Sequence, residues 1–150
     1  LEQLDIVLLH SNGDDEDIIL KHGGLDSLAE LKKEGLIRAI GMSTKTVAGG
    51  ILAASRSDVV MVTHNLDYRD EVAVIDYAGD RGVGVFIMKA LSSGNALTGD
   101  NLAEGDIVQQ SFDCIYQHKG VSSIILGSIS PAHIIDNAKR AIASYCNNRY

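Results

Sequence analysis

Five short runs of apolar residues recur along the 150-residue chain and constrain its fold more than any other feature. Each run is rich in Val and Ile and has few polar interruptions, as expected of parallel strands buried on both faces. A run this short also suits a turn of buried helix. We predict strands at these five runs: Leu4–His10, Ile37–Met42, Val59–Thr63, Gly84–Met88 and Val121–Leu126.

Segments with helical spacing separate the runs. They cover Leu25–Glu34, Thr46–Ser55, Glu71–Ala78, Glu104–His118 and a last helix that begins at Ser130-Pro131, where Ser suits the N-cap and Pro the first helical position. The last helix carries an apolar stripe that we expect to be buried, formed by Ile134, Ile135, Ala138 and Ile142. Alternation of strands and helices predicts one α/β unit over residues 1–150, built from βα units with right-handed crossovers.

Two α/β architectures fit this alternation, an open doubly wound sheet and part of a (β/α)8 barrel. A doubly wound sheet that binds a dinucleotide carries the motif GxGxxG after its first strand. This chain has His10-Ser11-Asn12-Gly13 at that place instead. Polar residues stand at the carboxyl ends of the predicted strands, which form the catalytic face of a barrel: His10, Ser43, Asn65, Lys89 and Ser128. We therefore predict a partial (β/α)8 TIM barrel with about five βα units and parallel strands.

Composition narrows the classes of partner. The formal net charge is −7, which argues against a broad nucleic-acid surface, and no apolar run approaches the roughly 18–20 residues of a membrane span. The two cysteines, Cys114 and Cys146, lie far apart and favour a reducing, cytoplasmic setting. The chain begins at Leu1 without a Met and enters a strand at once, so we expect it to be cut from a longer protein.

Five segments in this order resemble the aldo-keto reductase family from the fourth strand of its barrel to the eighth. They are Asp5–His10, Lys33–Ser43 (KEGLIRAIGMS), Asp58–Asn65, Ala90–Gly94 and Ile124–Asn137. The resemblance covers nearly the whole chain and implies reduction of a small aldehyde or ketone by hydride transfer from a nicotinamide cofactor. It also implies that the first three βα units of the barrel are absent.

The resemblance assigns roles to individual residues. His10 would orient the substrate carbonyl, and Ser43 would hold the nicotinamide carboxamide. The adenosine end of the cofactor would lie near the last helix, at Gly127, Ser128, His133 and Asn137. Lys89 stands where the family usually has Ser and is expected to bind the cofactor. The resemblance favours NADP(H) over NAD(H), although His133 replaces an Arg common in members that prefer NADPH.

Three departures affect the nicotinamide end. Met61 replaces a Gln that binds the carboxamide, Thr44 replaces an Asn, and Met88 replaces an aromatic ring that stacks on the nicotinamide. The proton-donor Tyr, its partner Lys and an Asp belong to the three absent units. We therefore expect this chain to be inactive alone.

Other interpretations remain open from the residues. One is a non-catalytic nucleotide- or partner-binding module, and a more distant one is a lyase with Lys89 as a Schiff-base nucleophile. The run Asp14–Asp17 reads as a solvated acidic loop or a helix start, and His64 as a surface or loop residue. A partial barrel leaves its first and last strands unpaired on one side, so we expect self-association through these open edges.

Overall fold

A computed structural model describes residues 2–92 and 106–149. Its elements in chain order are β1 (Leu4–His10), α1 (Asp15–Leu20), α2 (Gly24–Lys33), β2 (Ile37–Ser43), α3 (Val47–Ala54), β3 (Val59–Thr63), α4 (Val72–Gly79), β4 (Gly84–Met88), α5 (Ile107–Tyr116), β5 (Val121–Ile124) and α6 (Pro131–Arg149). All five predicted strands are confirmed, and the last ends two residues earlier than predicted. Residues 93 and 94 of one family-like segment, Ala90–Gly94, and residues 104 and 105 of the predicted helix Glu104–His118 lie outside the described residues.

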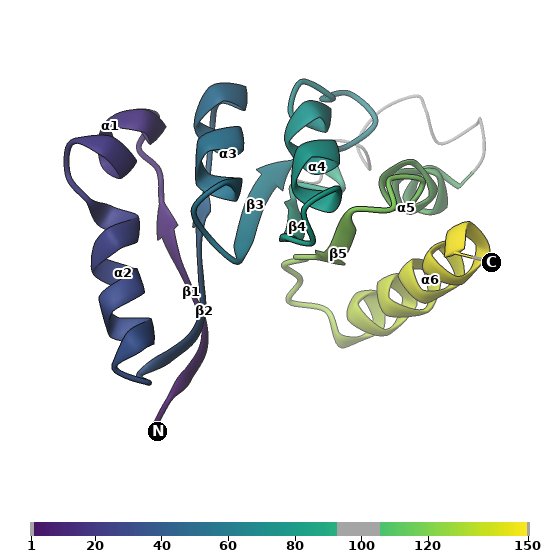
Figure 1. Ribbon diagram of the computed structural model, residues 1–150. Coiled ribbons are helices and arrows are strands. Elements are labelled where there is room, and N and C mark those ends of the chain that lie inside the picture. The colour runs from purple at the N-terminus through teal and green to yellow at the C-terminus, as the bar shows by residue number, and fades with distance from the viewer. Residues whose placement is uncertain (1, 93–105, 150) are drawn as a thin grey trace.

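The five described strands form one parallel sheet in the order β1-β2-β3-β4-β5. The sheet curves like part of a barrel wall, and helices follow one another along its outer side (Figure 1). Each connection from strand to strand contains at least one helix, as parallel pairing requires. The chain is therefore a partial (β/α)8 barrel.

The two faces of the sheet differ in burial. Side chains that point towards the helices are fully buried, among them Val60 and Val62 of β3 and Ile87 of β4. On the opposite face Val59 of β3 is buried, but Met61 and Phe86 are only half-buried. The prediction of burial on both faces is therefore wrong at Met61 and Phe86, because the described sheet does not close to cover its inner face.

Helix α6 packs along α5 and leaves its apolar stripe exposed. Ile134, Ile135 and Ile142 are 53–64% exposed, which contradicts the predicted burial of this stripe. Its contact with α5 uses other residues: an Arg140–Asp106 ion pair, the hydroxyl of Ser144, and the ring of Tyr145, which meets that of Tyr116 edge-on at 5.5 Å. β5 is the edge of the described sheet, so no neighbouring strand lies beyond it for the stripe to cover. No helix among the described residues, α6 included, is long and apolar enough to cross a membrane.

A buried carboxylate fixes the segment between β2 and α3. Asp15, 1% exposed at the start of α1, accepts hydrogen bonds from the backbone N–H groups of Lys45 and Thr46 at 3.0 and 2.8 Å and from the Thr46 hydroxyl at 2.7 Å. The predicted helix start at Asp14–Asp17 is confirmed, and the alternative of a solvated loop is wrong for Asp15. Gly49 is required here, because a Cβ on it would lie 2.1 Å from the Asp15 Cβ.

We expect Gly49→Ala to destabilise the fold by about 1–3 kcal/mol, although Ala favours helix over Gly by about 1 kcal/mol. The added methyl must displace Asp15 and disturb its hydrogen bonds. Urea unfolding followed by circular dichroism measures the change. Gly127→Ala is the control, since a Cβ there meets nothing within 4 Å. Equal stability of the two variants would contradict the requirement for Gly at position 49.

Candidate active site

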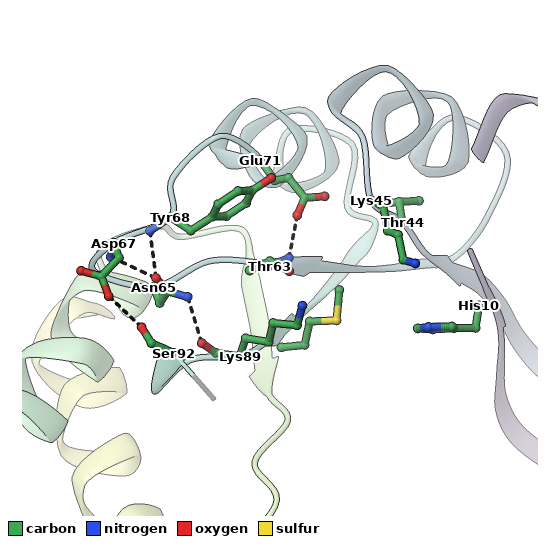
Figure 2. Close-up of a pocket in the computed structure, with 11 residues that line it drawn as sticks. His10, Thr44, Lys45, Thr63, Asn65, Asp67, Tyr68, Glu71, Lys89 and Ser92 are labelled. Carbon is green, nitrogen blue, oxygen red and sulfur yellow. Dashed lines mark hydrogen bonds between the residues drawn. The ribbon is translucent and has the colours of Figure 1, made fainter. Parts of the chain in front are cut away.

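A cavity of about 690 Å³ opens at the carboxyl edge of the sheet (Figure 2). Its lining residues end a strand, follow one directly, or lie in the connections after β3 and β4. They are His10, Thr44, Lys45, Thr63, Asn65, Asp67, Tyr68, Glu71, Met88, Lys89 and Ser92. Strands β1 to β4 all contribute, so parallel pairing has brought together residues from across the chain.

Lys89 is held in an unusual backbone conformation beside this cavity. Its φ of 57° lies in the left-handed region, which costs a non-glycine residue free energy and is found preferentially at functional sites. The side-chain amide of Asn65 donates to the Lys89 carbonyl at 3.0 Å. The Asn65 side-chain oxygen in turn accepts the N–H groups of Asp67 and Tyr68. Asn65 therefore ties the loop after β3 to the end of β4.

His10 and Lys89 enter the cavity from opposite sides, His10 at the end of β1 and Lys89 after β4 (Figure 2). Ser43, at the end of β2, is buried beside the cavity, and its hydroxyl donates to the Met88 sulfur at 3.8 Å. Met61 lies opposite Ser43 in the β2–β3 register. Three of the predicted site residues, His10, Ser43 and Lys89, are thus brought together at this edge of the sheet.

Glu71 carries a buried carboxyl group that the sequence analysis did not single out. The side chain is 1% exposed, and Oε2 accepts the N–H of Thr63 at 2.8 Å. Burial raises the pKa of Glu71 to about 7; the charge of Asp15 adds to the rise, while the Thr63 hydrogen bond and the charge of Lys89 oppose it. An acidic residue at a helix start is ordinarily solvated, so spacing alone gave no signal of this burial.

The other four predicted cofactor residues lie around the start of α6. Ser128 and Asn137 line a second cavity of about 330 Å³ between β5 and α6. Gly127 and His133 are exposed, and the His133 N–H donates to the hydroxyl of Ser130, which caps the helix as predicted. The predicted site residues therefore fall into two groups, one at each cavity.

His64 lies in the loop directly after β3, as one of its two predicted placements has it, but it is fully buried, so the alternative of a surface residue is wrong. Its ring meets that of His118 edge-on at 4.9 Å, and its Nε2 lies 4.0 Å from the Cys114 sulfur. Burial, and then the charges of His118 and Arg69, hold the pKa of His64 below its ordinary value. In the described part of the chain, no group of three or more His, Cys, Asp or Glu residues could hold a metal ion.

Comparison with solved structures agrees with this fold. An aldo-keto reductase from Pseudomonas aeruginosa is 38% identical, with a TM-score of 0.84 over 95% of this chain and 53% of its own. The holo form of an aldo-keto reductase from Bacillus halodurans is 19% identical, with a TM-score of 0.74 over 93% of this chain and 56% of its own. The chain thus spans about half the length of these structures.

The fold and the edge at which the cavity opens define the chain as part of a (β/α)8 barrel enzyme fold. The model of the aldo/keto reductase family matches residues 1–114, and the chain belongs to that family. None of the curated protein sequences compared with the chain matches it significantly. The family match includes His10, Ser43 and Lys89 and ends before the residues around α6.

We expect Glu71 to give the fold a distinctive pH dependence. A carboxyl group whose pKa rises from 4.5 to about 7 on folding binds its proton more tightly in the native state. Its contribution to stability is complete below pH 4.5 and is lost as the pH rises through 7. Glu71→Gln removes this loss, so between pH 4.5 and pH 8 the stability of the variant relative to wild type should rise by about 3 kcal/mol.

Urea unfolding at a series of pH values measures this difference. Glu34→Gln, the same change at an exposed residue after α2, is the matched control. A difference between Glu71→Gln and wild type that stays constant from pH 4.5 to pH 8 would contradict the raised pKa.

Proposed function

We propose that the chain is the C-terminal part of an NADP(H)-dependent carbonyl reductase, comprising the fourth to eighth βα units of its barrel. The family and the partial barrel support this proposal. The observation that carries it is the meeting of His10, Ser43 and Lys89 at the carboxyl edge of the sheet, where barrel enzymes build their active sites. The substrate is a small aldehyde or ketone.

The two cavities suit the two ends of the cofactor. Ser43 and Lys89 would hold the nicotinamide end, where a Lys also suits a phosphate oxygen. Gly127, Ser128, His133 and Asn137 would hold the adenosine end at the start of α6, since barrels favour phosphate sites after their last strands and at an added helix N-terminus. When bound, the cofactor supplies the hydride for the carbonyl carbon. His10 donates a hydrogen bond to the carbonyl oxygen and so polarises the bond.

Carbonyl reduction also requires a proton for the oxygen, and the one tyrosine among the residues that line this cavity is a poor donor. Tyr68 lines the cavity, but burial, and then the charges of Glu71 and Asp70, raise the pKa of its hydroxyl. A raised pKa makes a weaker acid, so Tyr68 does not suit the role. We therefore propose that this chain does not turn over carbonyl substrates by itself.

Lys89 is less suited to Schiff-base chemistry. A nucleophilic lysine of that kind is activated by desolvation or by a neighbouring cation, whereas Lys89 is exposed and lies within the field of the Glu71 carboxylate. The non-catalytic binding module remains a second candidate, because Met61 and Met88 stand at positions where the family carries nicotinamide-binding side chains.

Calorimetric titration of the purified chain with NADPH and NADH tests the proposal. We expect saturable binding that is tighter for NADPH. Asn137→Ala and His133→Ala should each weaken binding about three- to tenfold, as loss of one hydrogen bond does. His22→Ala, a change at another exposed histidine, is the control for His133.

Binding of both cofactors with equal strength in all variants would contradict an adenosine site at α6. Incubation with NADPH and simple aldehydes should leave the NADPH absorbance unchanged. Turnover by this chain would refute its inactivity. Cofactor binding together with no reduction, even when a chain that supplies the remaining βα units is added, would favour the binding module.

Open edges and apolar surface support a further proposal, that the chain associates with itself. Leu4 and Ile6 of β1 are 47% and 43% exposed, and Ile125 follows β5 at the opposite edge with a similar exposure. Unpaired strand edges recruit other chains.

Both cysteines are free, which suits a reducing, cytoplasmic setting.

We expect sedimentation velocity to detect dimers or larger species whose fraction grows with protein concentration. Ile6→Lys places a charge on the β1 edge and should shift the distribution towards monomer. Asp80→Lys introduces the same charge at an exposed residue that follows α4, away from both edge strands, and is the control. A concentration-independent monomer for wild type would contradict association through the edges.

A further inference from the structure

The Lys89 side chain departs from the alternation of the strand that it follows. Val85 and Ile87 of β4 are fully buried towards the helices. Phe86 and Met88 alternate with them and are half-buried on the inner face. Because successive side chains of a strand point to opposite faces, a regular continuation would direct Lys89 into the helix layer, where an ammonium group is costly to bury. Lys89 instead lines the active-site cavity together with Met88.

The left-handed backbone of Lys89 accounts for this departure. Its φ of 57° lies roughly 180° from the value of a parallel strand. Rotation about the N–Cα bond by that amount swings the side chain from the helix side of the sheet to the cavity side. Ser92, with a φ of 49°, is the other non-glycine residue with positive φ in the described part of the chain. Such conformations persist only where the surrounding structure holds them.

A closed ring of four hydrogen bonds holds both residues. The Lys89 carbonyl accepts from the Asn65 side-chain amide at 3.0 Å and from the Ser92 N–H at 2.9 Å. The Ser92 hydroxyl donates to Asp67 Oδ2 at 2.9 Å. The Asp67 N–H donates to Asn65 Oδ1 at 3.0 Å and closes the ring. Figure 2 draws the three bonds that involve side chains, all at one side of the cavity.

The Lys89 ammonium group is available to a ligand. It has no hydrogen bond or ion pair with any residue that the structure describes, and Glu71 acts on it only through the field of its charge. Lys32, in contrast, binds the Asp58 carboxylate at 2.6 Å. A compact ammonium group on a cavity wall suits an anionic oxygen, such as that of a phosphate.

We propose that Asn65 and Ser92 are positioning residues, which keep Lys89 in its left-handed conformation so that the ammonium group can bind a phosphate oxygen of the cofactor. This inference rests on the proposed function, which assigns Lys89 to the cofactor. It adds that the contact depends on two side chains that need not touch the cofactor themselves. When the ring opens, Lys89 relaxes towards a strand-like φ and its side chain leaves the cavity.

Calorimetric titration of a double-mutant cycle with NADP⁺ tests the proposal. We expect Lys89→Ala to weaken binding about tenfold, as loss of a hydrogen bond from a charged group does. Asn65→Ala should weaken binding at least threefold in the wild-type background and less than 1.5-fold in the Lys89→Ala background, because the two residues act through one contact. A merely structural role of Asn65 would weaken binding equally in both backgrounds and would overturn the proposal.

Two controls accompany the cycle. Asn12→Ala removes an exposed Asn whose Oδ1 also accepts a backbone N–H, that of Asp14, and should leave NADP⁺ binding unchanged. Binding of 2′-AMP, which has no nicotinamide end, should be the same in all variants. Loss of 2′-AMP binding in Asn65→Ala would show general disruption and overturn a specific action on Lys89.

Ser92→Ala provides an independent cycle should Asn65→Ala not fold, as judged by circular dichroism. It removes the bond to Asp67 and should weaken NADP⁺ binding at least twofold, but only while Lys89 is present. Urea unfolding tests the backbone: Lys89→Gly should unfold at a higher urea concentration than Lys89→Ala, because glycine adopts positive φ without strain. The reverse order would overturn the left-handed turn.

The outcomes also separate this inference from the proposed function. If NADP⁺ binds wild type and Lys89→Ala equally, the Lys89 contact and its positioning are wrong but the cofactor site stands. If wild type binds neither NADP⁺ nor 2′-AMP, the cofactor site and the Lys89 contact are both overturned for this chain.

Discussion

Parallel pairing in chain order is the constraint on which the site depends. Each strand pairs with the next, and each return path runs through helices on the outer face, so the carboxyl ends of β1 to β5 must share one edge. His10 and Lys89 are far apart in sequence and meet at one cavity for this reason alone. A site of this kind needs no local motif, because the sheet assembles residues that follow different strands.

Two buried carboxyl groups beside that edge have pKa values shifted in opposite directions. Burial alone would raise the pKa of Asp15, but hydrogen bonds with the Ser11 side chain, the Thr46 side chain and the backbone of Lys45 and Thr46 hold that pKa below its ordinary value. Among the described residues Glu71 has one hydrogen-bond donor, the Thr63 N–H, and burial raises its pKa to about 7. The hydrogen bonds that Asp15 accepts therefore stabilise its charge and hold the backbone at Lys45 and Thr46 beside the cavity. The second carboxyl oxygen of Glu71, Oε1, has no hydrogen-bond partner among the described residues. The nearby charge of Asp15 also disfavours ionisation of Glu71.

The sequence could predict much of this structure because strand burial and strand ends are local signals. Continuous Val- and Ile-rich runs located the strands, and the polar residue after each run located His10 and Lys89. Periodicity reports which residues can be buried, not whether a partner lies opposite. The stripe containing Ile134 is amphipathic but has no strand to cover, so it is exposed. Glu71 is buried by tertiary contacts that no spacing encodes, and it was missed.

The replaced residues near Ser43 form a consistent set when the strand register is considered. Met61 lies beside Ser43 in the sheet, and the sulfur of Met88 accepts a hydrogen bond from the Ser43 hydroxyl. Two thioethers therefore lie next to Ser43, the residue expected to contact the carboxamide. Thioethers pack well against flat rings but bind amides poorly. The two methionines therefore keep a surface that can pack against a flat ring and remove a partner for an amide.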